Sequence, residues 1–211
     1  MKILSQEQVW NKIATDWSKY RQNPIQEVAE FLKNKKGKLL DLGCGSGRNM
    51  IKQDGLEYYG CDFSEHMLKF AQEKSQKLGI KAKLSKCNAD KLGFDDEFFD
   101  VAIFISTLHC IENETLRKKA LQELFRVLKP EAEAMISVWD KSKDADMKNL
   151  ETNGGYIDWN KNGETFKRYY YFYDKDELIY LLKEVGFEII RISEYGDGKH
   201  EKKNIVVYVK K

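Results

Sequence analysis

The feature that most constrains the fold is a short apolar segment that runs directly into a cluster of glycines. Residues 38 to 42 predict a strand, and its end overlaps the cluster Asp41-Leu-Gly-Cys-Gly-Ser-Gly47. Glycines at a strand end let the backbone turn sharply and pass close to a ligand. In open α/β sheets, ligands bind outside the carboxyl ends of the strands. The segment therefore predicts a parallel sheet with a ligand site at this edge.

The residues around this cluster alternate between predicted helices and strands, which is typical of a parallel α/β sheet. The nearly continuous apolar run at 99–105 is typical of a central strand buried on both faces. Further strands are predicted at 57–61, 82–87 and 134–139. Helices are predicted from 9 to 17, from Asn23-Pro24 to 32, briefly after the glycines, from Ser64 to Gly79, and from 113 to 128 before Pro130.

The pattern changes after residue 140. Residues 141 to about 167 are polar and lack clear periodicity, so we expect an excursion from the core there. Asp174 and Glu177 predict a capping box for a helix that Gly186 ends. A strand, a Gly196-Asp-Gly turn and a last strand over 204–209 then predict an antiparallel hairpin added to the parallel sheet.

Composition excludes several classes of protein. The 36 Lys and Arg and 34 Asp and Glu residues leave a net charge of +2, which is too small to demand a nucleic-acid partner. No apolar run approaches the roughly 20 residues of a membrane-spanning helix, and the start MKILSQEQVW lacks the apolar region of a signal peptide. We therefore expect a cytoplasmic protein without membrane contact. Four cysteines without a CxxC pair, beside three histidines, predict reduced thiols and no metal site.

Two acidic positions make the glycine cluster more informative. Asp62 lies 19 residues after Gly43, at the end of the second predicted strand, where a carboxylate can accept hydrogen bonds from both hydroxyls of a ribose. Ala89-Asp90 follows the third strand in the same way. Together these features predict a cofactor that contains adenosine. The spacing disfavours NAD, because Arg48 stands where a dinucleotide site has its third glycine.

Three segments resemble motifs of class I S-adenosylmethionine-dependent methyltransferases: Leu40 to Gly47, Gly60-Cys-Asp-Phe-Ser64 and Asn88-Ala-Asp90. The resemblance implies an α/β, Rossmann-like fold whose seven-stranded, mostly parallel sheet has an antiparallel last strand and helices on both faces. It implies S-adenosyl-L-methionine as the cofactor. The residues that it assigns to the cofactor are Asp41, Gly43, Cys44, Gly45, Asp62, Phe63, Ala89, Asp90, Ile105 and Leu108.

The same resemblance implies individual roles. Gly43 and Gly45 would face the methionine part, and Asp62 would hold the ribose hydroxyls. Phe63 would pack against the adenine, although plain core packing stays open for it. Asp90 would accept a hydrogen bond from the adenine amino group. Ile105 and Leu108 would flank the donor methyl group.

A second resemblance covers nearly the whole chain and concerns the methyl acceptor. Arg21 before Pro24, Thr107-Leu-His109, Glu123 to Pro130, Val138-Trp139 and Arg168-Tyr-Tyr-Tyr-Phe172 are similar to motifs of the tRNA wobble-uridine methyltransferases, which esterify 5-carboxymethyluridine at the anticodon. The chain departs from that family at several positions. It has His109-Cys110 where the family has His-His, Pro24-Ile25 in place of Pro-Trp, and Tyr171 in place of His. It also has Pro130-Glu-Ala132 in place of Pro-Gly-Gly and Asn204-Ile-Val206 in place of Asn-Trp-Tyr. These departures leave the fold and cofactor in place and the exact acceptor open.

Candidate catalytic residues follow from the implied chemistry. A carboxylate with a pKa of about 4 is ionised at pH 7 and needs no general base, so positioning is the main task. Arginine grips a carboxylate with two parallel hydrogen bonds, which makes Arg21 and Arg168 the candidate clamps; Arg21 could instead bind the carboxylate of the cofactor. His109 could bond the acceptor or be a half-buried structural histidine.

The aromatic residues beside Arg168 are candidates for binding the substrate. Trp139, Tyr169 and Tyr170 could stack on an unpaired anticodon base, but strand alternation would bury half of the tyrosine run in the core. Lysine-rich segments could contact tRNA phosphates or form an ordinary solvated edge.

We therefore expect an S-adenosylmethionine-dependent methyltransferase that forms the methyl ester of 5-carboxymethyluridine at the tRNA wobble position. Two alternatives stay open: a small-molecule methyltransferase that acts on a carboxylate, hydroxyl or amine, and a catalytically silent cofactor-binding subunit. The family resemblance implies the tRNA anticodon loop and a small zinc-binding activator protein as partners. We expect one domain over 1–211, made of N-terminal helices (1–36), a cofactor-binding core (37–140), a substrate-side insertion (141–173), and a last helix with a terminal hairpin (174–211).

Overall fold

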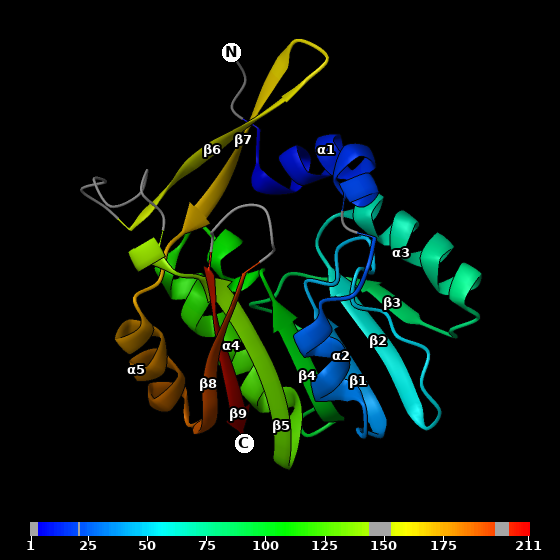
Figure 1. Ribbon diagram of the computed structural model, residues 1–211, viewed down its shortest axis with the longest axis vertical. Helices are drawn as coiled ribbons and strands as arrows, with labels where there is room; N and C mark the ends of the chain where they lie inside the picture. The colour runs from blue at the N-terminus through cyan, green and yellow to red at the C-terminus, as the bar shows by residue number, and fades with distance from the viewer. Residues whose placement is uncertain (1–3, 21, 144–152, 197–202) are drawn as a thin grey trace.

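A seven-stranded sheet forms the centre of the molecule in a computed structural model that describes residues 4–20, 22–143, 153–196 and 203–211 (Figure 1). The strand order is β3-β2-β1-β4-β5-β9-β8. The strands are β1 (Gly37–Leu42), β2 (Leu56–Asp62), β3 (Lys83–Lys86), β4 (Phe99–Ile105), β5 (Leu128–Trp139), β8 (Glu188–Gly196) and β9 (Lys203–Lys210). Strands β1 to β5 pair in parallel, whereas β9 is antiparallel to both β5 and β8. The predicted sheet, with its antiparallel last strand, is confirmed.

Helices cover both faces of this sheet. On one face, α4 (Glu114–Val127) and α5 (Lys175–Val185) bury Leu124 and Leu182 in a common apolar core. On the other face, α2 (Gln26–Leu32) and α3 (Glu65–Leu78) contribute Val28 and Ala71 to a second core. Successive residues of β4 point alternately into these two cores. Burial on both faces explains why its sequence is continuously apolar.

Helix boundaries follow the predicted capping residues. The Ser64 hydroxyl accepts a hydrogen bond from the Met67 N–H at 3.1 Å at the start of α3, and Gly79 ends that helix with a φ of 64°. At the start of α5, the Glu177 carboxylate accepts from the Asp174 N–H at 3.4 Å, as in a capping box.

Two predictions of local structure are wrong. The short helix expected after the glycines is absent: the turns at Gly43 to Asn49, in which Gly43, Gly45 and Gly47 have a positive φ, lead into residues 50–53, which have no regular structure. In addition, β5 begins at Leu128, directly after α4 and six residues before the predicted start. Its pairing with β4 is irregular around Pro130, which has no N–H to donate.

The segment after residue 152 departs most from the sequence-based expectation. Strands β6 (Gly154–Lys161) and β7 (Glu164–Tyr171) form an antiparallel hairpin that pairs with no strand of the main sheet. Asn162 and Gly163 connect them with φ values of 51° and 78°, which suit the type I′ turn that Asn-Gly favours. The excursion from the core is therefore confirmed, but it is regular structure. The Asn-Gly dipeptide is the signal that identifies it, and periodicity alone does not.

The hairpin and the N-terminal helix α1 (Gln6–Tyr20) lie side by side beyond the carboxyl ends of the central strands (Figure 1). Trp10 and Ile13 of α1 pack with Phe166 of β7 in a third apolar cluster. The Gln6 side chain joins the two elements, because it accepts from the Tyr169 N–H at 2.9 Å and donates to the Lys167 carbonyl at 3.1 Å. We call α1 and the β6–β7 hairpin together the roof.

The remaining regular elements are two short 3-10 helices, η1 (Leu108–Cys110) and η2 (Lys141–Lys143). Within the described ranges, no helix has the length and apolar character to cross a membrane.

Candidate active site

A cavity of about 730 Å³ lies between the roof and the carboxyl edge of the sheet. Its volume is in the range of small-molecule and cofactor sites. We divide its wall into two parts. The glycine side consists of the turn after β1 and the ends of β2 and β3, with Gly43, Cys44, Gly45, Ser46, Asp62, Phe63, Asn88, Ala89 and Asp90. The arginine side consists of the roof and the ends of β5 and β9, together with η1, and includes Trp10, Trp17, His109, Trp139, Trp159, Arg168, Tyr170 and Asn204.

The glycine turn leaves room for a ligand against its backbone. A Cβ atom at Gly43 would lie 2.2 Å from Cγ2 of Thr107, so this glycine packs directly on the end of β4. A Cβ atom at Gly45 would meet no other atom of the described chain within 4 Å. Because Gly45 also lines the cavity, the open space beside it is where a ligand can approach the main chain.

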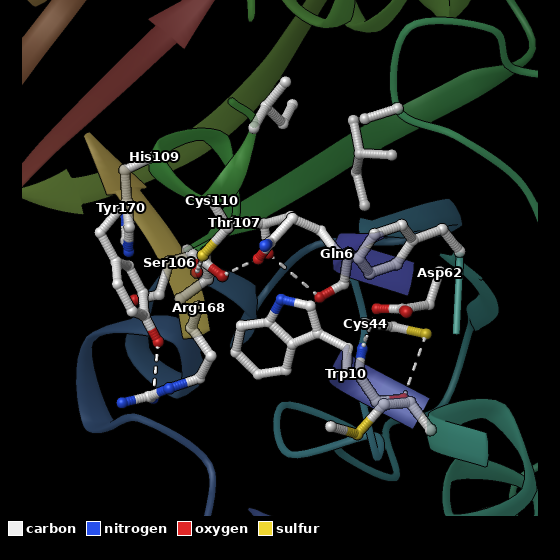
Figure 2. A pocket seen from close by; sticks show the side chains of 18 of the residues that line it. Gln6, Trp10, Cys44, Asp62, Ser106, Thr107, His109, Cys110, Arg168 and Tyr170 are labelled. Carbon is white, nitrogen blue, oxygen red and sulfur yellow. Dashed lines mark hydrogen bonds between the residues drawn. The ribbon is translucent and has the colours of Figure 1, made fainter. Parts of the chain in front are cut away.

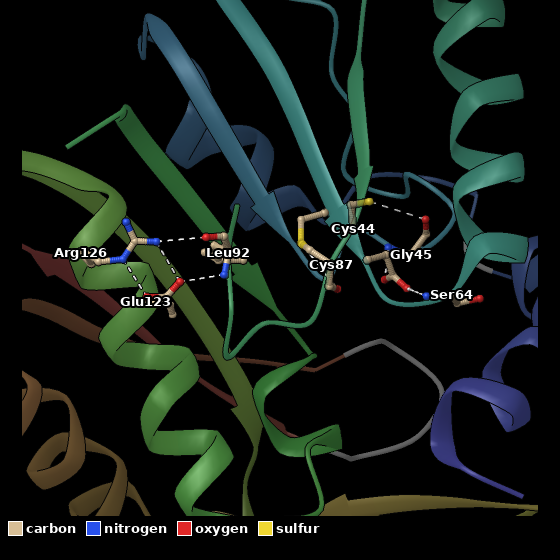
Figure 3. The surroundings of a disulfide bond; sticks show 9 residues. Cys44, Gly45, Ser64, Cys87, Leu92, Glu123 and Arg126 are labelled. Carbon is tan, nitrogen blue, oxygen red and sulfur yellow. Dashed lines mark hydrogen bonds and ion pairs between the residues drawn. A yellow bond between two sulfur atoms is a disulfide. The ribbon is translucent and has the colours of Figure 1, made fainter. Parts of the chain in front are cut away.

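Asp62 is a buried carboxylate at the end of β2. It accepts hydrogen bonds from the N–H groups of Gly45 and Ser64, each at 2.9 Å, and Figure 3 shows both partners. Burial raises the pKa of Asp62 to about 6, while these two backbone bonds oppose the rise. A carboxylate has about four lone-pair sites, so Asp62 can accept two further hydrogen bonds from a ligand. Two adjacent hydroxyls of a ribose fit that capacity.

The structure brings together the predicted cofactor residues with two exceptions. Asp41 does not line the cavity: the Tyr58 hydroxyl donates to its carboxylate, and burial raises its pKa to about 7. Leu108 is fully buried in the core beneath the site and does not line the cavity either. The predicted residues that do line it are Gly43, Cys44, Gly45, Asp62, Phe63, Ala89, Asp90 and Ile105.

The prediction of four reduced thiols is wrong for one pair of cysteines. Cys61 at the end of β2 and Cys87 just after β3 form a disulfide, with their Cα atoms 5.8 Å apart (Figure 3). The two residues are 26 positions apart in the sequence, and it is the pairing of β2 with β3 that brings them together. Cys44 and Cys110 are free thiols that line the cavity.

Arg168 is the central charged group of the arginine side. It lies on β7, is 7% exposed, and donates from Nη1 to the Tyr170 hydroxyl at 2.7 Å (Figure 2). Its guanidinium carbon is 5.0 to 5.5 Å from the ring centres of Trp17, Trp159 and Tyr170. Its Nε–H has no hydrogen-bond partner among the described residues. Because a buried cation with an unused donor is costly, this arrangement favours an anionic ligand.

Strand alternation determines which of the predicted aromatic residues reach the cavity. Arg168 and Tyr170 occupy alternate positions of β7 and share its buried face. Tyr169 lies between them on the opposite face, where its ring packs on Tyr156 at 5.5 Å, and it does not line the cavity. The expectation that alternation buries half of the tyrosine run is confirmed, and Tyr169 is separated from the other predicted substrate residues.

His109 and Trp139 form an aromatic stack with Tyr170. The ring of Trp139 lies 4.3 Å from that of Tyr170 and 4.9 Å from that of His109. His109 is 1% exposed, its Nδ1 atom has no partner within the described chain, and burial lowers its pKa to about 3. The imidazole is therefore neutral at pH 7, and it can exchange a hydrogen bond with a ligand without adding charge.

Sequence reasoning missed several residues of the arginine side. Trp10 and Trp17 contribute only to the apolar periodicity of α1, and Trp159 lies in the segment without an assigned element. Buried polar atoms of Trp10 (Nε1) and Asn204 (Oδ1) also lack partners in the part of the chain that the structure describes. A periodic pattern marks such residues as buried but does not distinguish a core from a cavity wall. Arg21, a predicted clamp, lies outside the described residues.

Comparison with known proteins agrees with this geometry. A family model described as "Methyltransferase domain" matches residues 40–136. A tRNA (carboxymethyluridine(34)-5-O)-methyltransferase from Arabidopsis thaliana is 35% identical over 133 residues, which are 62% of this chain and 31% of that protein. The chain thus spans about a third of the length of this relative.

Solved structures share the fold. A structure of an S-adenosylmethionine-dependent methyltransferase from Methanosarcina mazei has a TM-score of 0.72 at 23% identity, covering 89% of this chain and 98% of the other. A 1,6-didemethyltoxoflavin-N1-methyltransferase from Burkholderia thailandensis, solved with S-adenosylhomocysteine, has a TM-score of 0.69 at 16% identity, covering 100% of this chain and 92% of the other.

The predicted cofactor is S-adenosyl-L-methionine. The glycine side fits it on structural grounds, because a buried carboxylate with two free acceptor sites stands beside an open backbone turn. Asp62, expected to hold the ribose, and Gly43 and Gly45, expected to face the methionine part, line one part of the cavity. Phe63, Ala89 and Asp90, which are expected near the adenine, line the same part.

Proposed function

We propose that this chain, in which residues 40–136 match a methyltransferase-domain model, is a class I S-adenosylmethionine-dependent methyltransferase that methylates the carboxylate of 5-carboxymethyluridine at the wobble position of tRNA. The observation that carries the acceptor class is Arg168, a buried cation with an unused Nε–H in the wall of the cavity. The specific acceptor is suggested by the Arabidopsis relative, whose name describes this modification.

The reaction is a direct substitution at carbon. Bound S-adenosylmethionine supplies a methyl group activated by a positively charged sulfur. A carboxylate oxygen forms the new C–O bond while the C–S bond breaks, and the departing electron pair neutralises the sulfur. The acceptor is already ionised at pH 7, so no side chain has to remove a proton. Orientation and exclusion of water then supply the rate enhancement, which amounts to several kcal/mol in well-oriented systems.

The arginine side is suited to that task. Arg168 offers planar, paired donors to a carboxylate. Three aromatic rings surround its guanidinium, and the Tyr170 hydroxyl occupies Nη1, so the cation has a defined orientation before a ligand binds. The neutral His109 can add a hydrogen bond without neutralising the arginine. We propose that Arg168 and His109 contact the acceptor and that Trp139 and Tyr170 form the wall beside it.

The proposal assigns the parts of the domain accordingly. Residues 37–140 form the cofactor-binding core, and 141–173 form the substrate-side insertion, because β7 carries Arg168 into the cavity. The proposed substrate is the anticodon loop of a cytoplasmic tRNA. A separate small zinc-binding activator protein is the proposed partner.

The test is methyl transfer from labelled S-adenosylmethionine to an anticodon stem–loop that carries 5-carboxymethyluridine. An otherwise identical stem–loop with unmodified uridine is the control, and a panel of small carboxylic acids runs in parallel, each with and without a zinc-binding activator. Base-labile label in the modified nucleoside is the expected result. Label confined to the small acids would move the function to small-molecule metabolism. Cofactor binding without label in any acceptor would identify a silent subunit.

A further inference from the structure

Asn204 has a buried amide side chain in the cavity wall, and the proposed methyl transfer to a carboxylate gives this amide no role. It lies near the start of β9, is 5% exposed, and lines the arginine side. Its Oδ1 atom has no hydrogen-bond partner in the described part of the chain. A buried acceptor left unpaired costs about 1–3 kcal/mol. This cost is avoided if a ligand donates a hydrogen bond there.

The orientation of the amide is determined by its other end. Nδ2 of Asn204 lies 3.5 Å from the carbonyl oxygen of Tyr195 on the neighbouring strand β8. Exchanging the two ends of the amide would place an oxygen against that carbonyl oxygen, where neither atom can donate. Oδ1 is therefore the end that is free to accept.

The register of the sheet places Asn204 in the same wall as Arg168. Asn204 lies directly opposite Trp139 in the antiparallel pair of β9 and β5, and directly opposed residues share a face. Trp139 stacks on Tyr170, whose hydroxyl accepts from Arg168. The amide and the guanidinium are thus each next to a ring of the same aromatic stack, Asn204 beside Trp139 and Arg168 beside Tyr170.

The unpaired atoms differ in whether they donate or accept a hydrogen bond. Of the buried unpaired atoms on the arginine side, Arg168 Nε and Trp10 Nε1 can only donate, and the neutral His109 Nδ1 can donate or accept. Asn204 Oδ1 can only accept. A carboxylate uses the donors but offers no hydrogen to the amide. The set is complementary to a ligand that has both a carboxylate and an N–H group.

The carboxylate and the N–H group of such a ligand must lie well apart, because the places that they occupy lie over different strands of the sheet. Strands β4, β5 and β9 are consecutive neighbours, and the spacing of about 4.8 Å between strands puts Asn204 about 10 Å across the sheet from the end of β4. Ile105, which is expected to flank the donor methyl, ends β4. A ligand that reaches both places needs a ring or similar spacer between its carboxylate and its N–H.

We propose, on the basis of the function proposed above, that Asn204 determines specificity for uracil by accepting a hydrogen bond from its ring N3–H. Arg168 holds the carboxylate of the substituent on C5 of the same base. Cytosine has an unprotonated nitrogen at position 3, so its lone pair would face the lone pairs of Oδ1. Asn204 therefore admits 5-carboxymethyluridine and rejects the cytidine analogue.

The experiment compares two anticodon stem–loops of identical sequence, one with 5-carboxymethyluridine and the other with 5-carboxymethylcytidine at the wobble position. The full-length chain, with the activator protein if the first assay requires it, should favour the uridine at least tenfold in kcat/KM, as expected when a mismatched base leaves a buried polar group unpaired. Asn204→Ala should reduce that preference to within about threefold, mainly by losing activity on the uridine.

Two further variants make the result specific. Asn204→Leu keeps the number and branching of the side-chain heavy atoms and removes the acceptor without leaving a cavity, so it replaces Asn204→Ala if the smaller side chain impairs folding. Asn153→Ala is the matched control, because Asn153 bonds Lys141 and Tyr171 and does not line the cavity. This control should retain the preference of the wild type. Thermal melting and binding of S-adenosylmethionine establish that each variant is folded.

The possible outcomes separate this inference from the proposed function. If the wild-type protein methylates neither stem–loop, the proposed function is wrong, and the role of Asn204 is overturned with it. If it methylates the uridine but shows no preference, or if both Asn204 variants keep the preference, only the role of Asn204 is overturned. Loss of the preference in the Asn204 variants and its retention in Asn153→Ala support the inference.

Discussion

The two sides of the cavity differ in how the chain supplies their polar groups. On the glycine side, these groups are backbone amides and short polar side chains, including the Asp62 and Asp90 carboxylates, from the ends of three neighbouring strands within residues 43 to 90. On the arginine side, they are side chains from α1, η1, β7 and β9 that meet only in the folded molecule. A cofactor shared by many enzymes can be bound by a local motif, whereas the acceptor site requires tertiary assembly. Changes on one side should therefore leave the other largely intact.

The largest expected effect belongs to Arg168. Arg168→Ala should lower kcat/KM for methyl transfer at least 100-fold, because removing one partner of a buried, hydrogen-bonded charge pair costs several kcal/mol. The affinity for S-adenosylmethionine should stay within about twofold, which titration calorimetry can measure. Arg168→Lys keeps the charge but loses the planar fork, so it should rescue only part of the activity. Activity of Arg168→Ala within about threefold of the wild type would exclude the arginine clamp.

Substitution of Asp62 should instead weaken cofactor binding. Asp62→Ala should weaken the binding of S-adenosylmethionine about 10- to 100-fold, since ribose hydroxyls would lose a buried acceptor worth about 1–3 kcal/mol. Calorimetric titration with S-adenosylhomocysteine measures this effect without turnover. Asp41→Asn is the control, because Asp41 is buried nearby but does not line the cavity. Equal affinities in wild type and Asp62→Ala would mean that the ribose lies elsewhere.

A pH dependence of cofactor binding is expected from the same residue. The pKa of Asp62 is raised from 3.8 to about 6, so protonation favours the folded state. Its contribution to stability is complete below pH 4 and is lost as the pH rises through 6. Cofactor binding should have the opposite dependence, because the ionised form is the better acceptor: affinity should rise roughly tenfold between pH 5 and pH 7.

The variant Asp62→Asn tests whether Asp62 causes this pH dependence. Asp62→Asn should bind the cofactor with an affinity that is nearly constant around pH 6. Asp41, whose pKa is raised to about 7, titrates close to the same range but does not line the cavity, so it should contribute little to the pH dependence of cofactor affinity. A midpoint near 6 that survives in Asp62→Asn would assign the titration to another group.

The smallest expected effect tests the orientation of the clamp. Tyr170→Phe removes the hydroxyl that accepts from Arg168 at 2.7 Å but keeps the stack on Trp139. The hydroxyl orients Arg168 without contacting the acceptor itself, so its loss should cost about 0.5–1.5 kcal/mol, the range of an ordinary hydrogen bond, and reduce kcat/KM about three- to tenfold with little change in cofactor affinity. Tyr169→Phe makes the same substitution on the opposite face of β7 and should leave the rate unchanged. Equal rates for the two variants would show that the hydroxyl of Tyr170 does not position Arg168.

The difference between the two sides also explains what could be predicted from the sequence. Gly43, Gly45 and Asp62 could be assigned together because each follows a strand of the same parallel sheet, and the carboxyl ends of such strands meet at one edge. Trp10 and Asn204 could not, because their sequence patterns indicate burial only. The disulfide between Cys61 and Cys87 depends on strand order, which residue spacing does not specify.

The hairpin was missed for a related reason. Alternation in β6 and β7 is obscured because aromatic residues occupy both faces of β7 and because β6 begins with two glycines. The two residues that define the hairpin, Asn162 and Gly163, form a local turn signal and contribute nothing to periodicity. Arg168 could still be identified as a candidate, but the face on which it lies follows from the register of this hairpin.

That register has a consequence for how the acceptor site can change. Pairing in β6–β7 is set by a two-residue turn and by the Gln6 side chain, which bonds the main chain of β7 on either side of Arg168. A shift of one residue would turn every side chain of β7 to the other face, exchanging Arg168 for Lys167 or Tyr169 without altering the main sheet. The residue that β7 presents to the cavity therefore depends on one hairpin whose strands pair only with each other among the described residues. An insertion or deletion at the tip of this hairpin shifts its register, so we expect it to change the acceptor that the cavity takes, in evolution or in protein engineering.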